Sequence, residues 1–209
     1  MKVLVTGFEP FDHEKINPSY EIVKALPDKW KKAEIIKKKV PVLYGKAIES
    51  VIEEIERNDV DIVIMLGQAK GRASITVERV AINVNDSKTP DNFKKVLKGV
   101  PVIEEGPVGY FSTLPIYEIV KALKRIKIPA KISNTAGTFL CNSLFYGVMH
   151  EISTKHLNVL AGFIHVPYLP LQALKNPDVP SMSFDLMLKG VKKAIEVSVK
   201  TDMPRSQNS

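Results

Sequence analysis

The one cysteine of this sequence, Cys141, stands where a thiol could act as a nucleophile. A short apolar segment, 130–132, follows Pro129 and is typical of a strand, while Gly137 and its polar neighbours favour a turn. Apolar residues then recur at helical spacing: Leu140, Leu144, Phe145, Val148, Met149 and Ile152. The pattern therefore places Cys141 at the beginning of a helix, after a strand and a turn.

A thiol in the first turn of a helix lies near unpaired N–H groups and the positive end of the macrodipole. Both favour negative charge, so we expect the pKa of Cys141 to lie below the ordinary value of about 8.5. The same N–H groups could bind an oxyanion. The alternative is that Cys141 is a small buried hydrophobic residue, as free cysteines usually are.

A histidine and a glutamate could complete a catalytic group with Cys141. His165 lies near the C-terminal end of the predicted strand 158–170, and Glu78 lies within the strand-like segment 74–84. Such positions can converge on one crevice of an open α/β sheet. A thiol needs a base, and the base needs a carboxylate that fixes its tautomer and stabilises its imidazolium form. The alternative for Glu78 is a strand carboxylate that faces water or a lysine.

The elements that must hold these residues alternate between strand and helix. Apolar, β-branched runs predict strands at 2–6, 34–42, 61–66, 74–84, 130–132 and 158–170. Helical spacing and cap signals predict helices at about 17–26, 45–58, 113–126, 141–152 and 183–199. Residues 85–110 are expected to form a long loop over a site or a neighbouring subunit. We therefore predict one α/β domain over residues 1–200 with a largely parallel sheet, and a frayed polar tail at 201–209.

Composition excludes several classes of function. The net charge of +7 comes from dispersed lysines, such as those at 37–39 and 192–193, with no interleaved aromatic residues, so we expect no nucleic-acid partner. No apolar run reaches the length of a membrane span and the N-terminus lacks a secretory pattern, so we expect no membrane partner. A single cysteine excludes an internal disulfide and a cysteine-rich zinc site. We expect a cytoplasmic protein without a cofactor or bound metal.

Two loops that follow predicted strands lie where open α/β sheets carry their binding sites. The first contains Phe8 and Phe11, which either line a site or cap the core. The second, 67–72, contains glycine but lacks the spacing of a phosphate-binding loop or a dinucleotide fingerprint.

In its motifs the sequence resembles the type I pyroglutamyl peptidases, also called pyrrolidone-carboxylate peptidases. The motifs are GFEPF (7–11), GQA (67–69), GR (71–72), ERVAIN (78–83), PDN (90–92), SNTAGTF (133–139), CN (141–142) and GFIHVPY (162–168). They run collinearly from residue 1 to about 199, and the cysteine and glutamate motifs are long and specific. The resemblance therefore covers nearly the whole chain.

The resemblance implies a thiol protease that removes an N-terminal pyroglutamyl (5-oxoprolyl) residue from peptides through an acyl-enzyme. Such an omega peptidase would have a three-layer α/β/α fold of the phosphorylase/hydrolase-like kind, a cytoplasmic location and a homotetrameric assembly. The resemblance also assigns Cys141 as nucleophile, His165 as general base and Glu78 as its orienting partner.

Binding residues follow from the same resemblance. Phe8, Phe11 and Phe139 match residues that line the slot for the lactam ring, and Asn17 and Gln68 match positions that bind around it. Pyroglutamate has no free α-amine, so its flat, neutral lactam suits an apolar slot with one hydrogen-bond donor and one acceptor.

The sequence departs from the family pattern at two places. Asp12 and His13 stand where the family has two glycines, so we expect a relaxed backbone there. Lys88 stands where an arginine is usual near the oxyanion site, and it cannot supply a guanidinium fork.

These departures leave open a catalytically silent peptide-binding or oligomer scaffold. A redox-sensing thiol is a third reading, although the chain has no second cysteine to resolve a sulfenic acid. A nucleoside phosphorylase-like enzyme is a fourth, which would lack a clear phosphate-binding loop.

Overall fold

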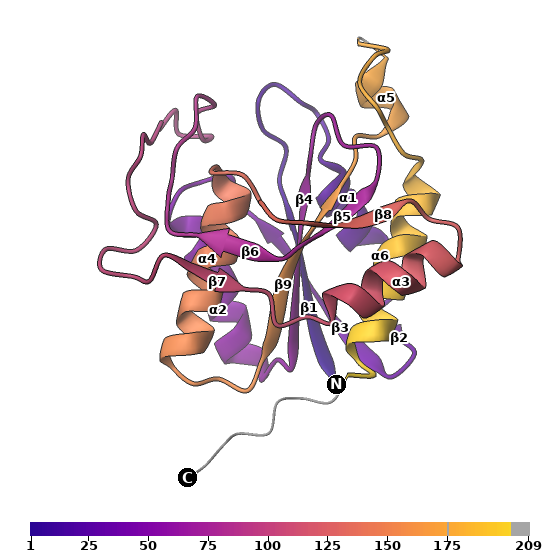
Figure 1. The fold of residues 1–209 in the computed structure, drawn as a ribbon, viewed down its shortest axis with the longest axis horizontal. Helices are drawn as coiled ribbons and strands as arrows, with labels where there is room; N and C mark the ends of the chain where they lie inside the picture. The colour runs from indigo at the N-terminus through magenta and orange to yellow at the C-terminus, as the bar shows by residue number, and fades with distance from the viewer. Residues whose placement is uncertain (175, 202–209) are drawn as a thin grey trace.

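The computed structural model describes residues 1–174 and 176–201, and within these ranges a seven-stranded sheet forms the centre of the protein (Figure 1). Its strands are β1 (Lys2–Phe8), β2 (Lys29–Trp30), β3 (Ala33–Val40), β4 (Ile62–Gln68), β5 (Ile75–Glu78), β8 (Ala130–Ser133) and β9 (Leu160–Val166). Their order across the sheet is β2–β3–β1–β4–β9–β5–β8. Strands far apart in the sequence, β4 and β9, are therefore neighbours at the centre.

Most neighbouring strands are parallel, as the apolar runs of the sequence predict. β1 pairs in parallel with β3 and β4, and β4 pairs in parallel with β9. β5 is antiparallel to β9 but parallel to β8, and the short edge strand β2 is antiparallel to β3. The inner strands β1, β4 and β9 are buried along almost their whole length because helices cover both faces.

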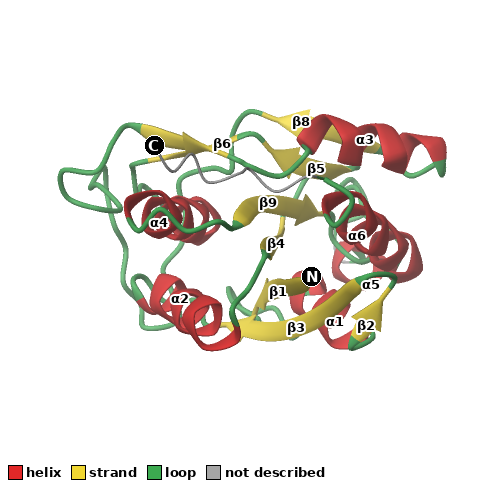
Figure 2. Cartoon of the chain, turned by 90° about the horizontal axis from the view of Figure 1, so that it is seen from below, coloured by secondary structure: helices red, strands yellow, loops and turns green. Residues whose placement is uncertain are grey.

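The helices make two outer layers, which Figure 2 shows on either side of the sheet. One layer consists of α1 (Pro18–Ala25), α3 (Ile116–Arg125) and α6 (Phe184–Ser198), which share a hydrophobic cluster with one face of the sheet. The other consists of α2 (Lys46–Asn58) and α4 (Leu140–Thr154), which share a second cluster with the opposite face. The three-layer α/β/α fold is thus confirmed. The helix expected beside Cys141 is α4, which begins one residue before it.

The single strand predicted at 74–84 is wrong. β5 ends at Glu78, and the next residues form β6 (Val80–Ile82), which pairs with β7 (Gly109–Phe111) in a separate two-stranded sheet. Arg79 lies between β5 and β6, where its backbone N–H donates to the carbonyl of Ser133 and its carbonyl accepts from the N–H of Ser112. Apolar, β-branched residues continue across this break, so the local pattern does not reveal it.

The loop expected at 85–110 is correct for most of its length and wrong at its end, where β7 begins. Its course is fixed by Asn83, whose side-chain oxygen accepts from the backbone N–H groups of Val102 and Ile103. Phe8, placed in a loop by the sequence reading, is the last residue of β1 and only 3% exposed.

Two further findings concern the C-terminal tail and membrane-spanning helices. The tail expected to be frayed lies outside the described residues from 202 onward, so that prediction stays untested. Within the described ranges, no helix combines the length and the apolar character needed to cross a membrane.

Candidate active site

The pairing of β5 with β9 brings Glu78 to His165. Thr76 lies directly opposite His165 in this antiparallel pair. Since side chains alternate along a strand, Glu78 lies on the same face as Thr76, two residues further on. Its Oε1 atom is 2.8 Å from Nδ1 of His165, and both residues are buried, Glu78 fully and His165 to within 4% exposure. The sheet itself therefore positions the carboxylate against the imidazole.

The pairing of β4 with β9 brings Cys141 to the same place. Gly67 lies opposite His165 in this parallel pair. A Cβ atom built on Gly67 would lie 2.8 Å from Sγ of Cys141 and equally close to the ring of Phe163. The thiol thus occupies the space that any larger residue at position 67 would fill. The thiol therefore lies against Gly67, the residue of β4 that is paired with His165. The three predicted catalytic residues, Cys141, His165 and Glu78, are thus brought together.

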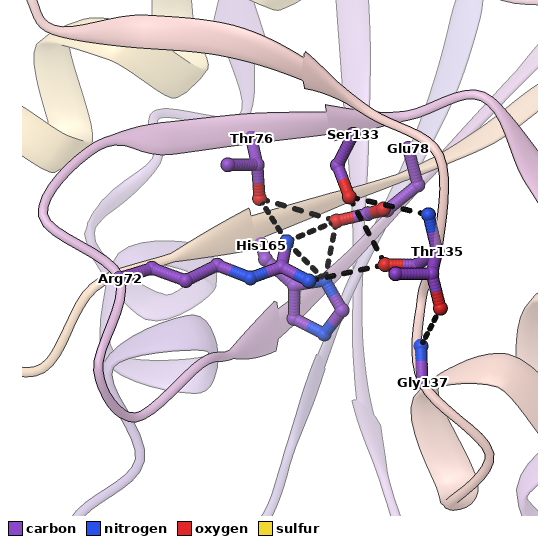
Figure 3. A network of polar contacts seen from close by, with 7 residues as sticks. All are labelled: Arg72, Thr76, Glu78, Ser133, Thr135, Gly137 and His165. Carbon is purple, nitrogen blue, oxygen red and sulfur yellow. Dashed lines mark hydrogen bonds and ion pairs between the residues drawn. The ribbon is translucent and has the colours of Figure 1, made fainter.

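Glu78 Oε1 accepts several hydrogen bonds at once (Figure 3). The guanidinium of Arg72 and the hydroxyl of Thr76 both donate to it, the latter over 3.1 Å. The third donor is Nδ1 of His165. Because a carboxylate can only accept, Nδ1 must carry the hydrogen, and the free lone pair of the neutral ring is then on Nε2. This tautomer leaves Nε2 available as a base.

Burial and charge set the protonation states of the pair. Burial alone would raise the pKa of Glu78, but the hydrogen bond from His165, the charge of that ring when it is protonated, and the charge of Arg72 lower the pKa below its ordinary value. Burial lowers the pKa of His165, and the Arg72 charge adds to this effect while Glu78 opposes it. An anionic Glu78 and a neutral imidazole are therefore the resting forms at neutral pH.

The thiol does not have the low pKa that its helix position predicts. Burial and the nearby Glu78 charge raise the pKa of Cys141 to about 12, although Arg72 and the backbone N–H of Cys141 act in the opposite direction. The expectation of a pKa below the ordinary thiol value is therefore wrong. The helix terminus favours negative charge, but desolvation of the thiol is the larger effect. The resting site holds a neutral thiol beside a neutral imidazole.

Phe8, Phe11 and Phe139 belong to the same hydrophobic cluster as Cys141. Phe139 immediately precedes α4, and its ring centroid lies 5.9 Å from that of Phe11. Tyr44 packs edge-on against Phe139 with centroids 5.8 Å apart. Tyr44 was missed by the sequence reading because it lies outside the family motifs, and the only local signal was its place just before the helix α2.

Asn17 and Gln68 both have protein partners. The side-chain oxygen of Asn17 accepts from the N–H and the hydroxyl of Ser19 and so caps α1, while its amide donates to the carbonyl of Glu9. Gln68, the last residue of β4, accepts from the side chain of Gln172, 3.1 Å away in α5 (Pro170–Ala173). Asn17 thus stabilises the first loop, whereas Gln68 connects the site to α5.

The positions that depart from the family pattern are exposed. Asp12 has φ +52° and His13 has φ +62°, so both adopt the left-handed conformation that favours glycine. The expectation of a special backbone at these positions is confirmed. Lys88 is also exposed.

Comparison with known proteins places the chain among peptidases. It matches the family model described as pyroglutamyl peptidase over residues 1–201. It is 49% identical over 200 residues to pyrrolidone-carboxylate peptidase 1 of Caldanaerobacter subterraneus subsp. tengcongensis, with 96% of this chain and 98% of the relative covered. It is 50% identical over 200 residues to the pyrrolidone-carboxylate peptidase of Thermosipho africanus, with the same coverage.

Solved structures agree with these relatives. The crystal structure of pyroglutamyl peptidase I from Bacillus amyloliquefaciens matches with a TM-score of 0.93 at 44% identity, covering 96% of this chain and 95% of that one. A variant pyrrolidone carboxyl peptidase from the hyperthermophile Pyrococcus furiosus matches with a TM-score of 0.92 at 44% identity, covering 96% and 99%.

Proposed function

The chain belongs to the pyroglutamyl peptidase family, and from this membership we propose that Cys141, His165 and Glu78 carry out the family's reaction. The enzyme is a cysteine peptidase that removes an N-terminal pyroglutamyl residue from peptides. The observation that best supports the assignment is the 2.8 Å contact between Glu78 and His165, with the thiol of Cys141 beside the strand position adjacent to His165.

The reaction begins with a proton transfer. Nε2 of His165 takes the proton of the Cys141 thiol while Sγ attacks the carbonyl carbon of the pyroglutamyl residue. N–H groups in the first turn of α4 stabilise the resulting oxyanion. The C–N bond then breaks, and the imidazolium gives its proton to the departing amine. Glu78 stabilises the imidazolium during this step, because its carboxylate already accepts from Nδ1.

Water completes the cycle. His165 removes a proton from a water molecule, the hydroxide attacks the thioester carbonyl, the C–S bond breaks, and the imidazolium returns its proton to the departing thiolate. The products are free pyroglutamate and the regenerated thiol. Because the resting thiol is neutral, His165 is needed for both halves of the reaction.

Specificity comes from a neutral slot. Phe11 and Phe139 provide aromatic surface beside the nucleophile, with Phe8 behind them in the same cluster. We assign Gln68, whose side-chain oxygen accepts from Gln172, to the polar edge of the lactam, and Asn17 holds the loop that carries Phe11. An N-terminal ammonium would have to lose its hydration in this slot without gaining a partner.

We also propose a cytoplasmic homotetramer, as the family resemblance implies. Val108, Phe111 and Tyr117 are 91%, 70% and 61% exposed, and large apolar side chains this exposed support a contact between subunits. Light scattering at neutral pH should give a mass several times the 23.3 kDa of the chain. A monomer at micromolar concentration would contradict this.

The function is tested by a panel of reporter amides. Pyroglutamyl, prolyl and alanyl amides of one fluorogenic amine differ only in the residue that is removed. We expect rapid release from the pyroglutamyl amide alone. Absence of turnover on all three by the folded protein would instead favour the silent scaffold.

A further inference from the structure

Arg72 reaches into the site from the loop between β4 and β5. Its side chain is 24% exposed, whereas Glu78 beneath it is fully buried. One guanidinium nitrogen, Nη1, donates to Glu78 and Thr76 and lies 3.5 Å from Nδ1 of His165. The other, Nη2, donates to the carbonyl oxygen of Thr135 over 3.0 Å (Figure 3). A single side chain thus joins two parts of the site.

The contact with Thr135 links Arg72 to the nucleophile. Thr135 lies in the turn between β8 and α4, and this turn leads directly to Cys141. The turn is braced internally, since the hydroxyl of Ser133 donates to the Thr135 carbonyl and the N–H of Gly137 donates to the Thr135 hydroxyl. A rigid, planar fork that binds this turn and Glu78 together fixes the distance between them.

The charge of Arg72 matters as much as its shape. A buried carboxylate without a cationic partner is strongly destabilising, and Arg72 is the partner of Glu78. Among the described residues, the charged groups that act on His165 are Glu78 from β5 and Arg72 from the β4–β5 loop, and the Cys141 thiol from α4 lies against Gly67, which pairs with His165. In this group a fixed positive charge opposes both the protonation of His165 and the retention of the thiol proton.

We propose that Arg72 is a positioning residue for the hydrolysis, which holds Glu78 and the turn before Cys141 in one arrangement and balances the Glu78 charge. The proposal rests on the catalytic roles proposed above for Cys141, His165 and Glu78. Arg72 itself need not touch the substrate.

Removal of the charge has a defined sign. The positive charge of Arg72 lowers the pKa of both His165 and Cys141, so both pKa values rise when it is lost. The acid limb of the kcat/KM profile requires neutral His165 and should move to higher pH. Alkylation of the thiol at a fixed mildly alkaline pH should become slower, because less thiolate is present.

Three variants separate charge from shape. Arg72→Gln removes the charge, and Arg72→Lys keeps the charge but loses the fork. Arg79→Gln is the matched control, since Arg79 directly follows Glu78 but its guanidinium binds Asn134 and Tyr117 instead. Measurements are the thermal midpoint, kcat and KM on the pyroglutamyl amide across pH, and the rate of iodoacetamide alkylation of the one thiol.

We expect Arg72→Gln to lower kcat/KM by at least about tenfold, mainly through kcat, with the acid limb at higher pH and alkylation slowed. Arg72→Lys should have a lower kcat than the parent, while the acid limb of its kcat/KM profile should stay at nearly the same pH. Arg79→Gln should match the parent in both limb and alkylation rate.

The proposal is overturned if the acid limb and alkylation rate of Arg72→Gln equal those of Arg79→Gln, whatever the loss of activity. If Arg72→Gln does not fold, the kcat of Arg72→Lys becomes the test. A kcat equal to that of the parent in Arg72→Lys would contradict the proposal. Alkylation does not depend on turnover, so it measures the effect of Arg72 on the thiol even if the parent does not hydrolyse the pyroglutamyl amide. A parent that does not hydrolyse this amide would contradict the proposed function instead.

Discussion

Glu78 Oε1 lies 2.8 Å from His165 Nδ1 although 87 residues separate the two in the sequence. The contact results from the pairing of β5 with β9, which places Thr76 opposite His165 and Glu78 next to it on the same face. A carboxylate at this position fixes the Nδ1–H tautomer and is ready to stabilise an imidazolium. The role that we propose for Glu78, orienting His165 as the base, can therefore be tested by removing the charge of Glu78.

Glu78→Gln removes that charge and keeps the shape. The amide can hold the ring, but it cannot stabilise the imidazolium, and it can favour the wrong tautomer by donating where it should accept. We expect kcat/KM to fall by about ten- to a thousandfold, or roughly 1.4–4 kcal/mol, with folding intact. A carboxylate that merely paired with an exposed cation would contribute about 0–1 kcal/mol. Activity within twofold of the parent throughout the neutral range would remove Glu78 from the site.

The raised pKa of Cys141 predicts an unreactive resting thiol. Because burial and the Glu78 charge favour the neutral form, we expect slow alkylation by iodoacetamide at neutral pH and a rate that keeps increasing with pH beyond the ordinary thiol range. Glutathione serves as the unperturbed reference. A rate that is already at its plateau at neutral pH would show a preformed thiolate–imidazolium pair and contradict the assigned resting state.

Gly67 leaves the space that the thiol occupies. Gly67→Ala would place a methyl group 2.8 Å from Sγ of Cys141 and from the ring of Phe163, so one of them must move. We expect a loss of about 1–3 kcal/mol of stability from overpacking. We also expect a fall in kcat of about tenfold or more, because small misplacements of reacting groups are costly.

Gly162→Ala is the matched control for this change. Its new methyl group would collide with Ser112 and lie 2.8 Å from Leu114, so it overpacks the protein without touching the thiol. Both variants should have lower thermal midpoints. Equal kcat losses in the two would mean that Gly67 acts only through stability.

The neutral slot predicts strong selectivity between two five-membered rings. Prolyl substrates keep the ring but add a cationic amine and lack the lactam carbonyl, and burial of that charge without a partner is costly. We expect at least about a hundredfold preference in kcat/KM for the pyroglutamyl amide, or about 2.8 kcal/mol. Comparable kcat/KM values on both amides would contradict the assignment of Phe11 and Phe139 to the slot.

The sequence could predict those features that depend on local periodicity. Apolar residues at helical spacing located α4 and hence Cys141 near its start, and a continuous apolar run located β9 with His165 near its end. Glu78 was found because it lies in a strand-like run and within a long family motif. These signals are local, so they can be recognised in the sequence without knowledge of the tertiary structure.

Features that depend on distant partners could not be predicted. The break at Arg79 separates β5 from β6 only because β6 pairs with β7, which lies beyond a long loop. Arg72 belongs to a family motif, but the motif does not reveal its contact with Thr135, which lies 63 residues away. The pKa of Cys141 was predicted in the wrong direction because the helix terminus is visible in the sequence, whereas the burial that outweighs it is not.

The most direct test of the mechanism is to trap the acyl-enzyme. The parent is mixed with an activated pyroglutamyl ester, quenched in acid, and measured by intact mass and peptide mapping. We predict a single pyroglutamyl group on Cys141, which disappears on further turnover and never forms on a folded Cys141→Ala variant that has lost hydrolysis of the pyroglutamyl amide. Undiminished hydrolysis by Cys141→Ala, or an acyl group on another residue of the parent, would contradict the assignment of Cys141 as the nucleophile.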